Sequence, residues 1–188
     1  MAKKHRRSGG RKTGAIGSQP PANFRAFTTG FSGIANRIVT PIGLTPAFSP
    51  KDHPDGRMPY AVTQKKSLWD TGATGSVLTT ATIAELNLKP IGTATVNHAG
   101  GRSSSHTYLV NFYLPNRVAI AGVIVTECQD IAGNFDAIIG MDIISRGDLA
   151  ITNANGKTHM SFRFPSIETI DFVPERFRPP RARGAARA

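Results

Sequence analysis

The sequence has few of the features that mark secreted or membrane proteins. It contains one cysteine, Cys128, so no disulfide can form within the chain and nothing indicates an oxidising compartment. Its longest apolar run, residues 118–125, is too short for a membrane-spanning helix. No apolar stretch follows the basic residues 3–7, so a secretory signal is not expected. We therefore expect a cytoplasmic protein that makes no contact with a membrane.

Acidic residues are also scarce, with 12 Asp and Glu against 23 Lys and Arg. The excess positive charge lies at the two ends: residues 1–12 hold six basic residues and no acid, and residues 175–188 hold five Arg and one acid. Ends of this composition cannot bury apolar surface and are expected to be disordered. They are interpreted either as solubilising tails or as a weak, salt-dependent contact with nucleic acid or another polyanion.

The rest of the chain has the composition of a small β protein. A length of 188 residues suits one domain, and 19 Gly with 13 Pro favour a structure rich in turns. We expect a flexible basic, Gly- and Pro-rich arm over residues 1–35, a folded domain over 36–172 and a disordered Arg- and Pro-rich tail over 173–188. The sequence does not decide whether the arm is a linker, a localisation arm or a pro-segment.

Within the expected domain, short apolar runs alternate with turn residues, a pattern typical of β-strands. A helix is predicted over residues 80–88, because Thr82 and Glu85 offer a capping box and Pro90 ends the segment. Strands and hairpins are predicted at 60–62, 67–69, 77–79, 93–97, 107–114, 118–125, 137–139, 149–152 and 160–164. The prediction is a mostly-β domain with one or two short helices.

The segment with the clearest chemistry is the run Asp70-Thr71-Gly72-Ala73, which separates two apolar stretches. A carboxylate in such a place is costly unless it is hydrogen-bonded or used. The simplest interpretation is an Asp that caps a tight turn through nearby amides. A second segment, residues 135–144, contains Ile138-Ile139-Gly140 at 68 to 70 residues after Asp70, and it repeats the order of apolar strand, glycine and short helix.

Together these two segments resemble the retroviral-type, or retropepsin-like, aspartic proteases. The resemblance covers roughly residues 36–170 and implies a small closed β-barrel. It implies that Asp70 is the catalytic residue and that a homodimer is required for activity, because this is the only Asp-Thr-Gly in the chain. The two carboxylates would share a proton and activate a water molecule that attacks a peptide bond.

The resemblance also implies roles for residues around Asp70. Thr71 would form a hydrogen bond across the dimer, Gly72 would let its amide approach the carboxylate, and Ala73 completes this loop. The segment Ile138-Ile139-Gly140 would support it. The hairpin tip at Ala99, Gly100 and Gly101 would be a flap that closes over an extended peptide with apolar side chains beside the cut.

Other chemistries find little support. The five histidines show no metal-ligand spacing, no G-x-S-x-G elbow accompanies Ser76, and no phosphate- or dinucleotide-binding motif occurs, so neither a metal nor a cofactor is expected. Two alternatives to an aspartic endopeptidase stay open. One is a catalytically silent retropepsin-like module for dimerisation or peptide binding, and the other is a polyanion-binding protein that acts through its tails. The natural substrate and any self-processing are not decided by the sequence.

Overall fold

The computed structural model describes residues 24–53, 55, 57–98, 101–174 and 177. Within this part of the chain the elements are, in order, β1 (Arg25–Gly30), β2 (Ile38–Pro46), η1 (Pro50–Asp52), β3 (Thr63–Trp69), β4 (Val77–Thr79), α1 (Thr80–Glu85), β5 (Gly92–His98), β6 (Gly101–Leu114), β7 (Val118–Cys128), β8 (Ala137–Ile139), α2 (Met141–Ile144), β9 (Asp148–Thr152), η2 (Ala154–Gly156) and β10 (His159–Phe164). No helix in the described ranges combines the length and apolarity needed to cross a membrane.

A closed barrel forms the larger part of the fold. Its strands run in the order β2, β3, β8, β4, β7 and β6, and β6 pairs back with β2, which closes the ring. β5 pairs with β6 outside that ring. The barrel encloses fully buried apolar side chains, among them Leu44, Val110, Phe112 and Ile139. The predicted mostly-β barrel with two short helices is confirmed.

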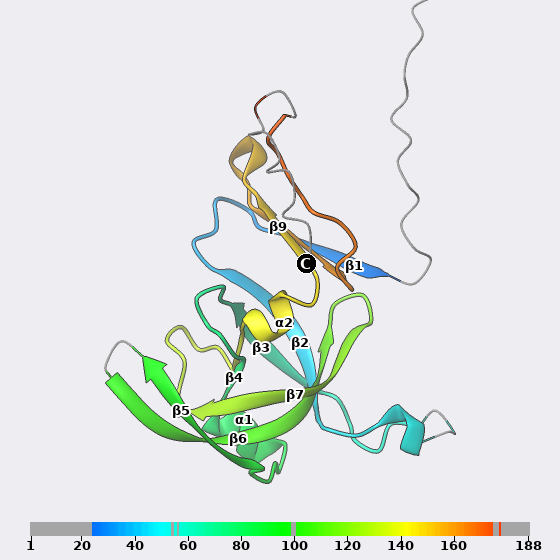
Figure 1. Ribbon diagram of the computed structural model, residues 1–188, viewed down its shortest axis with the longest axis vertical. Coiled ribbons are helices and arrows are strands. Elements are labelled where there is room, and N and C mark those ends of the chain that lie inside the picture. The colour runs from blue at the N-terminus through cyan, green and yellow to red at the C-terminus, as the bar shows by residue number, and fades with distance from the viewer. Residues whose placement is uncertain (1–23, 54, 56, 99–100, 175–176, 178–188) are drawn as a thin grey trace, which may run out of the picture.

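A second, three-stranded antiparallel sheet has the order β1, β10 and β9. Figure 1 shows it at one end of the barrel, beside α2. Its inner face carries Phe27 and Phe162, whose rings lie 6.1 Å and 5.1 Å from the ring of Trp69 at the end of β3. This aromatic contact buries all three side chains and fixes the last residue of the strand that leads into Asp70.

β1 lies within residues 1–35, which the sequence analysis assigns to a flexible arm. The described part of that range instead forms a strand from Arg25 to Gly30, paired over its whole length with β10. Phe27 is 8% exposed and belongs to the core. The folded domain therefore begins before residue 36, because a strand near the start of the chain completes a sheet with one near its end.

The predicted helix over residues 80–88 is shorter in the structure and is capped differently. α1 ends at Glu85, and its N-cap is Thr79, whose hydroxyl accepts a hydrogen bond from the Thr82 amide. Glu85 does not complete a capping box: its carboxylate lies 2.6 Å from Lys65 Nζ on β3. The ion pair to a neighbouring strand replaces the predicted local contact.

Candidate active site

Asp70 follows β3 directly and is held beside β8. These two strands are parallel, with Trp69 opposite Ile139 in the register. The Asp70 amide continues the ladder by donating to the Ile139 carbonyl oxygen at 3.0 Å. The segment of Asp70 and the second segment therefore lie side by side in the fold, on adjacent strands.

The turn after Asp70 brings backbone amides onto its oxygens. The Gly72 amide donates to Asp70 Oδ1 at 2.8 Å, and the Ala73 amide donates to the Asp70 carbonyl oxygen at 3.2 Å. A Cβ at Gly72 would lie 3.1 Å from Oδ1, so glycine suits this approach. Asp70 is half-buried, while Thr71 and Gly72 are exposed. Within the described residues only Oδ1 accepts a hydrogen bond, which leaves Oδ2 available for another partner.

Gly140 packs directly against the loop that follows Asp70. It is buried, and a Cβ there would lie 2.6 Å from the Gly75 carbonyl group and 2.9 Å from the Ala73 oxygen. The next residue, Met141, donates its amide to the Ala73 carbonyl oxygen at 2.8 Å. The start of α2 and the Asp70 loop therefore form one backbone-bonded unit, which restricts the direction in which Asp70 points.

One pair of side chains that the sequence analysis does not single out strengthens this unit. Ser76 is buried, and its hydroxyl donates to Asp142 Oδ1 at 2.8 Å while accepting the Gly140 amide at 3.1 Å. Asp142 Oδ1 also accepts the Ile143 amide at 3.0 Å. A serine at the entrance of a buried strand was the signal that could have revealed it, since a buried hydroxyl requires a partner.

The expected flap corresponds to the hairpin of β5 and β6. β5 pairs with β6 along its whole length, from Gly92 opposite Thr107 to His98 opposite Gly101. Gly101 has a φ of +123°, a conformation that favours glycine. Ala99 and Gly100, the other two residues of the predicted flap tip, lie outside the described residues. The hairpin is in place, and its role as a flap stays a prediction.

A cavity of about 750 Å³ lies between this hairpin and the barrel. Val77 of β4 and Ile138 of β8, which are paired with each other, contribute to its lining, and Val96 of the hairpin contributes from β5. Ile138 is also paired with Leu68, two residues before Asp70. The cavity is thus lined by β8, which pairs with β3 beside Asp70, and by β4, the strand that follows the Asp70 loop.

Two acidic residues beside Cys128, Glu127 and Asp130, line this cavity. Burial raises the pKa of the Cys128 thiol, and the negative charges of Asp130 and Glu127 raise it further. Tyr108, which is buried on the adjacent strand, donates its hydroxyl to Glu127 at 2.8 Å. Burial, that hydrogen bond and the charge of Glu127 raise the pKa of Tyr108 as well. Both groups therefore stay neutral at neutral pH.

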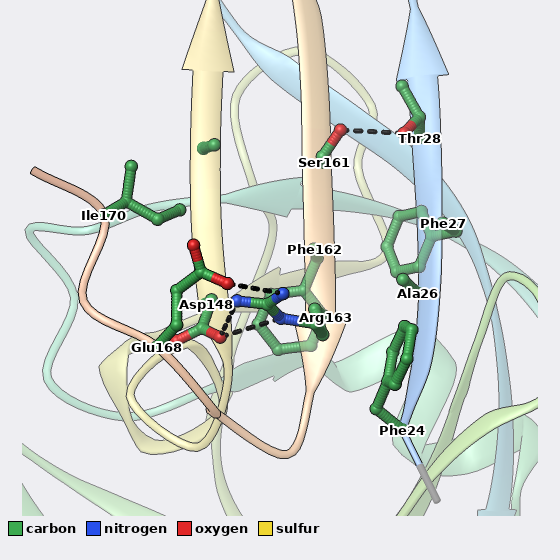
Figure 2. A pocket seen from close by; sticks show the side chains of 11 residues that line it. Phe24, Ala26, Phe27, Thr28, Asp148, Ser161, Phe162, Arg163, Glu168 and Ile170 are labelled. Carbon is green, nitrogen blue, oxygen red and sulfur yellow. Dashed lines mark hydrogen bonds and ion pairs between the residues drawn. The ribbon is translucent and has the colours of Figure 1, made fainter. Parts of the chain in front are cut away.

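A smaller cavity, of about 450 Å³, lies on the outer face of the three-stranded sheet. Figure 2 shows Arg163 between two carboxylates: its Nη2 lies 2.7 Å from Asp148 Oδ2, and its Nη1 lies 3.2 Å from Glu168 Oε2. Ser166 and the Ile167 amide also donate to Asp148. Burial opposes ionisation of Asp148, but these hydrogen bonds and the Arg163 charge outweigh it and lower the pKa to about 2. This network ties residues 166–168 to the sheet.

The Asp70 loop and the start of α2, here called the Asp70 unit, lie within a segment that matches a known protein family. Residues 63–143 match the family model described as aspartyl protease. The resemblance to aspartic proteases is confirmed. The aspartyl protease match runs from the first residue of β3 into α2, so it contains the Asp70 turn, the β5–β6 hairpin and Gly140. No curated protein matches the sequence.

Several solved structures are similar to this chain. A retropepsin-like aspartic protease from Rickettsia conorii is 10% identical, with 76% of this chain and 96% of that chain covered and a TM-score of 0.44. The EIAV protease, complexed with an inhibitor, is 22% identical over 58% of this chain and 86% of its own, with a TM-score of 0.42. The Simian Foamy Virus (mac) protease is 17% identical over 56% and 92%, with a TM-score of 0.36.

Proposed function

We propose that this protein is an aspartic endopeptidase that hydrolyses peptide bonds through Asp70 of two chains. The observation that carries the proposal is the Asp70 turn: a half-buried carboxylate is held by the Gly72 amide on one oxygen, at the edge of a unit that matches the aspartyl protease model. A carboxylate that only capped a turn would not require a buried second segment, Ile138–Gly140, packed against its loop.

The chemistry needs two carboxylates, and one chain supplies one Asp-Thr-Gly. The proposed partner is a second copy, with the exposed Thr71 and Gly72 of each chain at the contact and Thr71 hydrogen-bonded across it. Two carboxyl groups at close range cannot both ionise cheaply, so the pair holds one proton. The protonated and ionised members then have different tasks.

The ionised Asp70 takes a proton from water as the water oxygen bonds to the peptide carbonyl carbon. The protonated Asp70 of the other chain gives its proton to the carbonyl oxygen, and a tetrahedral gem-diol forms. The diol then collapses: the C–N bond breaks, one hydroxyl gives its proton to the Asp70 that is now ionised, and the leaving nitrogen takes the proton held by the other Asp70. The products are a carboxylic acid and an amine, and the dyad again holds one proton.

The peptide is proposed to bind as an extended strand under the β5–β6 hairpin, with its apolar side chains against Val77, Val96 and Ile138. Ala99, Gly100 and Gly101 form the proposed flap tip, and Ala73 keeps the loop free of a further hydroxyl beside Asp70. Main-chain hydrogen bonds would supply affinity that does not depend on sequence, while the cavity side chains would supply selectivity.

The test compares the wild-type protein with Asp70→Asn on a denatured protein between pH 4 and 7. We expect cleavage by the wild type only, with a rate that rises more steeply than linearly with enzyme concentration below the dimer dissociation constant. Asp52→Asn, the same change in the exposed η1, is the matched control and should cleave normally. Cleavage by Asp70→Asn at the wild-type rate would overturn the role of Asp70, and cleavage by neither protein at any concentration would favour the silent-module alternative.

A further inference from the structure

The cavity beneath the β5–β6 hairpin has walls of two different kinds. One side is apolar and includes Val77, Val96 and Ile138. The other is formed by the end of β7 and the loop that follows it, and it includes Glu127 and Asp130. No lysine or arginine is among the described residues that line the cavity. Its lining therefore combines an apolar surface with negative charge that has no internal counter-charge.

Neither carboxylate forms an ion pair within the part of the chain that the structure describes. Glu127 is fixed by hydrogen bonds from the hydroxyls of Thr80, at 2.7 Å, and Tyr108, at 2.8 Å, both neutral donors. Asp130 is exposed and makes no ion pair with any residue that the structure describes. Their combined field reaches the lining, because both charges raise the pKa of Cys128 there.

A side chain that suits such a cavity has an apolar stem and a cationic end. Lysine and arginine can lay their methylene groups along an apolar surface while the charged group reaches a polar rim. We infer that this cavity binds a lysine or arginine side chain of the peptide substrate, with Asp130 and Glu127 as the residues that select it. The inference rests on the proposed protease function, since the cavity shares β4 and β8 with the Asp70 unit.

The selection has a defined geometric origin. Val77 and Ile138 are paired residues on strands that flank the Asp70 loop, so a side chain on them belongs to a substrate residue close to the bond that is cut. Lysine and norleucine both offer an apolar stem to the apolar side of the cavity, and they differ in that only lysine ends in an ammonium group. The difference between these two residues therefore isolates the contribution of the carboxylates.

The experiment uses matched pools of fluorescent octapeptides that hold either lysine or norleucine at one position and mixed apolar residues elsewhere. Cleavage and equilibrium binding are both measured, for the wild type, Asp130→Asn and the control Asp52→Asn. For at least one position near the cut we expect the wild type to favour lysine about threefold to fivefold, the size typical of an exposed ion pair. Asp130→Asn should reduce this preference and Asp52→Asn should keep it, and high salt should weaken it.

The outcomes separate this inference from the protease proposal. If the wild type cuts both pools with equal efficiency at every position, the inference is overturned while the protease proposal stands. If no pool is cut but lysine peptides bind more tightly in an Asp130-dependent way, the protease proposal fails and the cavity assignment stands. If Asp130→Asn keeps the full lysine preference, other residues cause that preference, and the role of Asp130 is overturned. If peptides are neither cut nor bound, both proposals are overturned.

Discussion

Ser76 donates its hydroxyl to Asp142 across 2.8 Å and accepts the Gly140 amide at 3.1 Å, so one buried hydroxyl joins β4 to the start of α2. Ser76 and Asp142 lie 66 positions apart in the chain. The pair links the end of the Asp70 loop to the second segment, and Ser76 is buried while Thr71 and Gly72 are exposed. The buried Ser76 side chain thereby restricts the movement of the loop that carries Asp70.

Ser76→Ala should destabilise the fold by about 1–3 kcal/mol, because it leaves the buried Gly140 amide and the Asp142 carboxylate without their common partner. The free energy of unfolding from urea titration is the measurement. Ser161→Ala is the control: its hydroxyl is bonded to Thr28 at an exposed site, and we expect a loss below about 0.5 kcal/mol. Equal losses for the two variants would contradict a special role of Ser76.

Gly140→Ala should be more disruptive than its small size suggests. Its Cβ would lie 2.6 Å from the Gly75 carbonyl group, which is backbone and cannot rotate away. We expect a loss of about 1–3 kcal/mol in the free energy of unfolding, as for overpacked cores. Gly75→Ala is the matched control on the facing residue, since no atom lies within 4 Å of a Cβ there. A fully stable Gly140→Ala protein would show that the two loops can separate freely.

The Asp70 turn and the segment Ile138–Gly140 are predictable from the sequence, because each is a short continuous run. In both, an isolated polar residue or a glycine interrupts an apolar strand, and such contrast is visible without knowledge of the fold. The hairpin of β5 and β6 depends on the same local alternation, because its two strands are neighbours in the sequence. The structure adds that the two segments are adjacent parallel strands, β3 and β8.

Features that depend on distant partners were not predictable in the same way. β1 looks like part of a loose arm, because its strand partner β10 begins 129 residues after Gly30, and the apolar residue Phe27 finds Trp69 and Phe162 only in the fold. Glu85 leaves its predicted capping role because Lys65 on β3 offers a stronger, charged partner. In both places tertiary contact overrides a local preference.

Asp148→Asn should destabilise the protein at neutral pH but not in strong acid. The folded pKa of Asp148, about 2, is below its ordinary value, so its contribution is fully present above about pH 4 and is lost as pH falls through 2. We expect a loss of about 1–3 kcal/mol at pH 7, which shrinks below pH 4. Urea titrations of both proteins at several pH values provide the measurement.

The control for this prediction is Asp55→Asn, which removes a carboxylate that is exposed and lies 3.9 Å from the exposed Arg57. Its stability should stay close to that of the wild type at every pH. A loss for Asp148→Asn that persists unchanged at pH 2 would mean that the network acts through packing and not through the ionised carboxylate.

The last prediction concerns the pH dependence of the proposed dyad. Ala73 follows the Asp70 turn and has no hydroxyl, whereas a serine there could donate a hydrogen bond to an ionised carboxylate and lower the pKa of the dyad. We therefore expect the rate of peptide cleavage to be greatest above about pH 3.5, at weakly acidic to neutral pH, with the acidic limb moved to lower pH in Ala73→Ser by up to about one unit. Profiles of kcat/KM against pH for the two proteins supply the comparison. Asp148 keeps its charge across this range, because its pKa is lowered to about 2. A wild-type maximum below about pH 3.5, or identical acidic limbs in both proteins, would mean that residue 73 does not act on the dyad.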